Sequence, residues 1–282
     1  MEAEIADLLN LLELEQLEVN LFRGESRDIG SPQVFGGQVL GQALTAASAT
    51  VAGRVVHSLH AYFLRRGDFN APIVYQVDRS LDGHSFANRR VVAIQHGEQI
   101  FNMAASFQVV EEGLDHQTEM PQVPPPESLS DQTSLPPEIG RHLPEKLRQF
   151  FAQPRPFVFR IANPSVGTAP MRQIWFKAVG RLPDDERLHR NLLAYASDFF
   201  LLGTSMLPHR TSEFEGRLVM ASLDHAMWFH RSLRVDDWLL YAMESPSASG
   251  ARGFAQAGIF SRDGRLVATT AQEGLVRIKR GK

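Results

Sequence analysis

An internal repeat constrains the fold of this chain more than any other feature of its sequence, because a missed repeat leads to a wrong architecture. The string SLHAYF at residues 58–63 resembles LDHAMW at residues 223–228. In this alignment His60 and His225 are equivalent and lie 165 residues apart. Two copies are too few for a solenoid, so the repeat predicts a duplicated domain.

Hydrophobic periodicity and turn residues predict the same order of elements in both halves: a strand, a helix and then a run of antiparallel strands. For the first half we expect helices at 5–17 and 39–51 and strands at 19–23, 55–66, 72–80, 86–95 and 99–110. For the second half we expect a helix at 188–206 and strands at 157–162, 172–179, 217–231, 237–245, 252–261 and 265–278. An antiparallel sheet curled around one central helix satisfies this order, which indicates an α+β protein.

Proline marks the boundary between the two halves. Nine of the 16 prolines lie between Pro121 and Pro156. Proline fixes its own φ and donates no backbone hydrogen bond, so this segment is typical of a linker. We therefore predict an N-terminal domain at 1–112, a linker at 113–153 with a short helix at 144–151, and a C-terminal domain at 154–282.

Composition excludes several classes of function. The chain has no cysteine, which rules out disulfides, thiolate metal ligands and a cysteine nucleophile. A net charge of −3 gives no support for nucleic-acid binding. The longest apolar stretch, 192–203, is broken by Asp198 and is shorter than the roughly 20 residues of a membrane helix. The acidic start of the sequence does not resemble a signal peptide, so a cytoplasmic protein without membrane partners is expected.

Asp198 is the residue that most strongly suggests chemistry. It lies in the apolar string AYASDFFLL, and a carboxylate is costly to bury unless it is hydrogen-bonded. Buried acids are enriched at functional sites, although buried acids with a purely structural role are also common. The alternative is that Asp198 lies on a wet stripe or caps a break in the helix. The sequence pattern alone leaves both interpretations open.

Two further polar residues accompany Asp198 in the second half of the chain. Gln272 lies near the end of the last predicted strand, and Ser222 lies on the strand that repeats residues 56–59. The first half has only AASF, residues 104–107, at the place that corresponds to Gln272. A polar set that is present in one copy and missing from the other predicts one functional site per chain.

Other constellations are less convincing. Asp224 and His225 are adjacent on a predicted strand and therefore point to opposite faces, so they cannot act on each other directly. For the same reason the spacings of His57 with His60 and of His225 with His230 are unfavourable for metal binding, and we predict no metal and no cofactor. No G-x-S-x-G elbow or P-loop is present.

Four strings resemble the acyl-CoA thioesterase II (TesB-type) family: FGGQVLGQA at 35–43, LAYASDF at 193–199, LDHAMWFHR at 223–231 and AQEG at 271–274. The resemblance covers nearly the whole chain. It implies a double hotdog fold, in which two tandem domains each wrap an antiparallel sheet around a central helix. It also implies hydrolysis of fatty acyl-CoA to free fatty acid and CoA, and a homo-oligomer, either a dimer or a tetramer of double hotdogs.

The resemblance assigns the catalytic residues to Asp198, Ser222 and Gln272, and the family pattern has threonine where this chain has Ser222. It implies direct attack by a water molecule that Asp198 activates with the help of the other two. The residues that bind the substrate stay open, as does the role of Gly36 and Gly37, which either offer backbone amides to an anion or form a tight turn. A hydratase or dehydratase of the same fold and a non-catalytic acyl-CoA-binding protein are the alternatives.

Overall fold

The computed structural model describes residues 3–31, 33–130, 155–162, 170–209 and 217–278. The elements of the first half are, in chain order, α1 (Ala3–Leu12), β1 (Glu15–Glu18), β2 (Leu21–Gly24), α2 (Gly36–Ala49), β3 (Val55–Phe63), β4 (Ile73–Asp82), β5 (Phe86–Gln95) and β6 (Glu98–Gln108). A short 3-10 turn, η1 (Pro126–Ser128), follows in the connecting segment. The elements of the second half are β7 (Phe157–Ile161), β8 (Met171–Ala178), α5 (Glu186–Ser197), α6 (Leu201–Thr204), β9 (Leu218–Ser222), β10 (Asp224–Phe229), β11 (Leu239–Ser249), β12 (Arg252–Ser261) and β13 (Leu266–Ile278).

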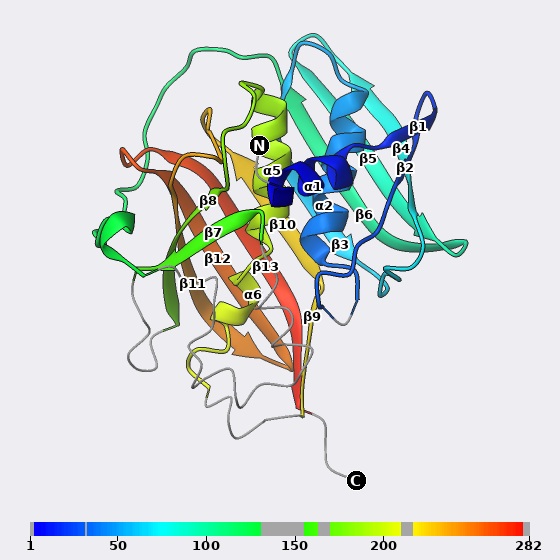
Figure 1. Cartoon of the computed structure of the whole chain (residues 1–282). Coiled ribbons are helices and arrows are strands. Elements are labelled where there is room, and N and C mark those ends of the chain that lie inside the picture. Colours follow the sequence, from blue (N-terminus) through cyan, green and yellow to red (C-terminus); the bar gives the residue numbers. More distant parts are fainter. Residues whose placement is uncertain (1–2, 32, 131–154, 163–169, 210–216, 279–282) are drawn as a thin grey trace.

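The described strands form one antiparallel sheet of 13 strands that crosses both halves of the chain. β4, β5, β6 and β3 follow one another on one side, and β10, β13, β12 and β11 follow in the corresponding order on the other. β3 and β10 meet at the centre, where His60 pairs with Ala226. Each half of the sheet encloses one helix, α2 or α5, as Figure 1 shows. This is a double hotdog, and the predicted α+β fold class is confirmed.

The two central helices pack directly against each other. Gly41 of α2 leaves so little space that a Cβ atom there would lie 3.3 Å from the Cβ of Tyr195 on α5. The Asn191 side chain on α5 donates a hydrogen bond to Thr45 Oγ1 on α2 at 3.1 Å. Small residues on α2 thus permit a close helix pair. The C-terminal end of α5 is thereby held beside the N-terminal end of α2.

Three local predictions were wrong. The helix predicted at 188–206 ends at Ser197, and Phe200, whose φ is +66°, separates it from α6. The strand predicted at 217–231 is divided into β9 and β10 around Leu223. The helix predicted at 5–17 ends at Leu12, because the following residues pair with β2 as a strand, and tertiary pairing overrides local propensity.

The alignment of the repeat also needs a shift of one residue. His60 is exposed and packs against the Trp228 ring at a centroid distance of 5.2 Å, whereas His225 is buried on the other face of the sheet. Side chains alternate between faces along a strand, so a slip of one residue exchanges the faces. The two histidines are therefore similar in sequence and different in environment.

The domain boundaries stay a prediction, since the continuous sheet joins both halves. The predicted linker helix at 144–151 lies outside the described residues. None of the helices in the described ranges is long and apolar enough to cross a membrane.

Candidate active site

Asp198 occupies the position that ends α5, and its side chain is only 7% exposed. Its Oδ2 accepts the backbone N–H of Gly37 at 2.9 Å, and its Oδ1 accepts Nε2 of Gln272 at 2.7 Å. Burial raises the pKa of the Asp198 carboxyl, and these two hydrogen bonds oppose the rise because they stabilise the charged form. Asp198 therefore terminates helix α5, as the capping interpretation expects, and its hydrogen-bonded carboxylate is buried and not on a wet stripe, while its catalytic role stays a prediction.

Gln272 connects Asp198 with Ser222. Its side chain is fully buried on β13, and Nε2 also lies 3.1 Å from Ser222 Oγ. β9 pairs with β13 so that Ser222 lies opposite Gly274, which places the serine near the amide. The structure thus brings together the three residues that the sequence selected, from a helix end and two neighbouring strands.

Gly36 and Gly37 begin helix α2 beside the carboxylate. A Cβ atom on Gly36 would lie 2.7 Å from Asp198 Oδ2, and one on Gly37 would collide with the carbonyl oxygen of Tyr195. Glycine is therefore required at both positions by close approach and not by an unusual backbone conformation. The backbone N–H of Gly37 donates to the side chain of Asp198. Gly37 therefore offers its amide to an anion, and this anion is the carboxylate of Asp198 in the same chain.

His225 is a neighbour of Asp198 that the sequence analysis missed. It is fully buried, with Nδ1 4.0 Å from Asp198 Oδ1 and Nε2 2.9 Å from Ser197 Oγ. Burial lowers its pKa to about 4. Asp224 points away and accepts the backbone N–H of Glu273, so the predicted separation of the adjacent pair is confirmed. In the sequence, the signal would have been a histidine on the buried face of its strand. The one-residue error in the alignment of the repeat concealed this signal, because it matched His225 with the exposed His60.

Two cavities of about 260 and 210 Å³ open at this site, and Gly36, Arg66 and Ser222 line both. The smaller cavity reaches Asp198. The larger has an apolar wall, formed by Val34, Val39, Phe63, Ile100 and Phe101. Arg66 is exposed and makes no ion pair with any described residue, whereas the neighbouring Arg65 pairs with Glu98 at 2.9 Å.

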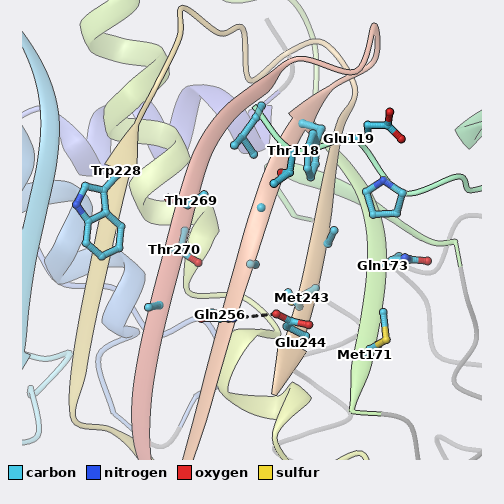
Figure 2. Close-up of a pocket in the computed structure, with 17 residues that line it drawn as sticks. Thr118, Glu119, Met171, Gln173, Trp228, Met243, Glu244, Gln256, Thr269 and Thr270 are labelled. Atoms are coloured by element: carbon cyan, nitrogen blue, oxygen red, sulfur yellow. Dashed lines mark hydrogen bonds between the residues drawn. The ribbon is translucent and has the colours of Figure 1, made fainter. Parts of the chain in front are cut away.

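A larger groove of about 530 Å³ lies elsewhere, over strands β8, β11, β12 and β13 (Figure 2). The segment with Thr118 and Glu119 borders it, and Gln256 within it donates to Glu244 at 2.8 Å. None of Asp198, Ser222 and Gln272 lines this groove. Its size alone therefore does not make it the place of the chemistry. In the described part of the chain, no three His, Asp or Glu side chains gather as a metal site.

Fold and site together define a double hotdog protein with one buried carboxylate–amide–hydroxyl site at the junction of its halves. Comparisons with known proteins agree with this class. Residues 147–275 match the family model described as acyl-CoA thioesterase, and residues 23–108 match that of the acyl-CoA thioesterase N-terminal domain. The chain is 45% identical to acyl-CoA thioesterase 2 of Haemophilus influenzae over 96% of its own length and 97% of that protein.

Solved structures show the same relationship. A crystal structure of the acyl-CoA thioesterase II TesB2 from Mycobacterium marinum has 45% sequence identity and a TM-score of 0.81, covering 97% of this chain and 99% of that one. A hot dog fold protein from Alicyclobacillus acidocaldarius, 19% identical, has a TM-score of 0.77, covers 96% of this chain and 98% of its own, and supports the fold alone. The chain belongs to the acyl-CoA thioesterase II (TesB-type) family of thioester hydrolases.

Proposed function

We propose that this protein hydrolyses fatty acyl-CoA to free fatty acid and CoA by direct attack of a water molecule that Asp198 activates. The observation that carries the proposal is the fixed carboxylate of Asp198, which is buried, accepts hydrogen bonds from Gln272 and Gly37, and lines a cavity. A thioester needs no covalent nucleophile, because its leaving thiol has a pKa of about 8.5. General-base activation of water is therefore sufficient chemistry.

Each member of the site has a separate task in this mechanism. Burial raises the pKa of Asp198 and so makes the ionised carboxylate a stronger base toward water. Gln272 holds that carboxylate through Nε2, while its Oε1 has no hydrogen-bond partner among the described residues and can accept from the water. Ser222 faces both cavities, where its hydroxyl can orient the water from the other side.

The oxyanion that forms during attack needs hydrogen-bond donors of its own. The N–H of Gly37 already binds Asp198, so this amide is engaged with the base and not with the substrate. The donors for the oxyanion therefore come from a group other than the Gly37 amide. This amide, at the start of α2, instead holds the general base, Asp198.

The surroundings of the site suit a CoA thioester. The apolar wall of the 260 Å³ cavity can take hydrocarbon, and Arg66, which is exposed and lines both cavities, can take an anionic group such as a phosphate of CoA. A cytoplasmic location and a homo-oligomer of double hotdogs stay predictions.

A hydrolysis assay with short, medium and long acyl-CoA esters tests the proposal through release of free thiol. We expect turnover with at least one chain length and fatty acid as the second product. Binding of acyl-CoA without hydrolysis of any ester would support a binding protein instead. Hydration of an enoyl-CoA without thiol release would support a hydratase.

A further inference from the structure

His225 is a buried polar side chain with an incomplete set of hydrogen bonds. The β10–β3 register places it opposite Ala61 in the interior, where it has no exposed surface. Its Nδ1 has no hydrogen-bond partner among the described residues. A buried polar atom without a partner loses its hydrogen bond to water and gains none in return, so such an atom needs an explanation. The nearest charged group to Nδ1 is Asp198, at 4.0 Å.

The hydrogen bonds of Ser197 determine which nitrogen of His225 carries its hydrogen. Ser197 has one hydroxyl hydrogen and donates it to the carbonyl of Ala194, in the last turn of α5, at 2.9 Å. In the contact between Ser197 Oγ and His225 Nε2, also at 2.9 Å, Nε2–H is therefore the donor and the serine oxygen is the acceptor. The backbone carbonyl of Ser197 is fixed as well, since it accepts the hydroxyl of Tyr241 at 2.6 Å. Nδ1 is then left without a hydrogen, as a bare lone pair 4.0 Å from Asp198 Oδ1.

The long distance between Nδ1 and Oδ1 follows from this arrangement. A carboxylate oxygen and a bare imidazole nitrogen are both acceptors, so they cannot bond in the resting state. One proton placed between them changes the repulsion into an O–H···N hydrogen bond. The two atoms would need to approach by about 1 Å to reach bonding distance, which small side-chain rotations can supply.

We propose that His225 is a positioning residue that holds the proton taken up by Asp198 during hydrolysis. This inference rests on the proposed hydrolysis and assigns one further step within it. As the water oxygen forms its bond to the thioester carbon, one water proton moves to Oδ1 of Asp198 and is hydrogen-bonded by Nδ1 of His225. When the carbon–sulfur bond breaks, this proton passes to the leaving sulfur, which gives fatty acid and CoA thiol and restores the carboxylate.

Two substitutions at His225 separate this role from a structural one. In His225→Gln, the longer amide can reach the position of Nε2 and keep the bond to Ser197, but the acceptor facing Asp198 is lost. In His225→Asn, the shorter amide lies near the position of Nδ1 and can present an oxygen to Asp198. We expect kcat for acyl-CoA to fall about 10- to 100-fold in His225→Gln, with KM changed less than about twofold. The Asn variant should keep a larger part of kcat.

A His225→Gln enzyme with wild-type kcat would overturn the proposal, as would a loss confined to KM or to thermal stability. Nitrogen NMR of the ¹⁵N-histidine-labelled wild-type protein provides a measurement that does not depend on the variants folding. It should find the hydrogen of His225 on Nε2, and a hydrogen on Nδ1 would contradict the proposal. Wild-type hydrolysis together with either contrary result would reject the role of His225 alone, whereas absence of hydrolysis in the wild type would reject the proposed function.

Discussion

Gly37 donates its backbone N–H to Asp198 Oδ2 at 2.9 Å and thereby links two residues that are 161 positions apart in the chain. The first amides of a helix have no intrahelical acceptor and carry partial positive charge. Helix α2 therefore stabilises the ionised form of Asp198 from the half of the molecule that lacks the polar set. The first repeat lacks those side chains but contributes to the site through its backbone.

Replacement of Gly36 by alanine tests this close approach. The new Cβ would lie 2.7 Å from Asp198 Oδ2 and force the carboxylate or the start of α2 to move. We expect Gly36→Ala to lower kcat at least ~10-fold and to reduce the free energy of unfolding by about 1–3 kcal/mol. Steady-state kinetics and urea unfolding measure the two effects. Gly97→Ala is the matched control for a glycine-to-alanine change, because its Cβ would meet no atom within 4 Å; its φ of +78° predicts a loss of stability without the loss of kcat.

The role of Asp198 as the base is tested by Asp198→Asn. Asparagine has nearly the same shape, but its amide cannot accept a proton from water. We expect kcat to fall at least ~100-fold in a thiol-release assay. Asp224→Asn is the matched control, because the Asp224 carboxylate accepts the backbone N–H of Glu273 and points away from Asp198. Near-normal turnover of Asp198→Asn would remove this residue from the mechanism.

Substitutions at Ser222 test the hydroxyl. Ser222 lines both cavities, so Ser222→Thr keeps the hydroxyl and adds a methyl group where space is available. We expect the Thr variant to stay within about threefold of wild-type kcat and Ser222→Ala to lose about 10-fold, since only the alanine cannot orient the water. A severe loss in the Thr variant with an active Ala variant would argue against the assigned role.

The pH dependence of kcat/KM should reflect the burial of Asp198. Its pKa is raised above the ordinary value of 3.8, and the base acts only when ionised. Activity should therefore fall as pH decreases through a midpoint above 3.8. Because the pKa of Asp198 is higher in the folded than in the unfolded protein, ionising this carboxyl requires more free energy in the folded state. The contribution of Asp198 to the free energy of unfolding therefore decreases as pH rises above its pKa in the unfolded protein. Kinetics from pH 4 to 8 would show the activity loss, and residual activity of Asp198→Asn should lack this acid limb.

Arg66 provides a test of CoA recognition. It lines both cavities at the site, and no described residue forms an ion pair with it. We expect Arg66→Ala to raise KM about 5- to 20-fold for acyl-CoA and to leave KM for the acyl-N-acetylcysteamine ester, which has no phosphate, nearly unchanged. Arg65→Ala is the comparison, because Arg65 is already paired with Glu98. An equal effect of Arg66→Ala on both esters would show that phosphate is not its partner.

Local patterns predicted most of the elements because strands and helices alternate polar and apolar residues with different periods. The strands over 86–95 and 252–261 were predicted at their observed positions. Local patterns failed where a tertiary contact decides the conformation. Helix α5 ends at Ser197 because the chain turns at Asp198 and Phe200 to direct the carboxylate to Gly37 and Gln272, and no periodicity within 188–206 contains that information.

The sequence by itself determined the duplication, the fold class, the family resemblance and the choice of Asp198, Ser222 and Gln272, because these depend on residue types and their order. The tertiary structure alone decided that the start of α2 binds the carboxylate, that His225 faces Asp198, and that Arg66 lines both cavities. These relationships join residues from different elements. They arise from the pairing of β3 with β10 and from the contact between α2 and α5, which short-range sequence patterns do not encode.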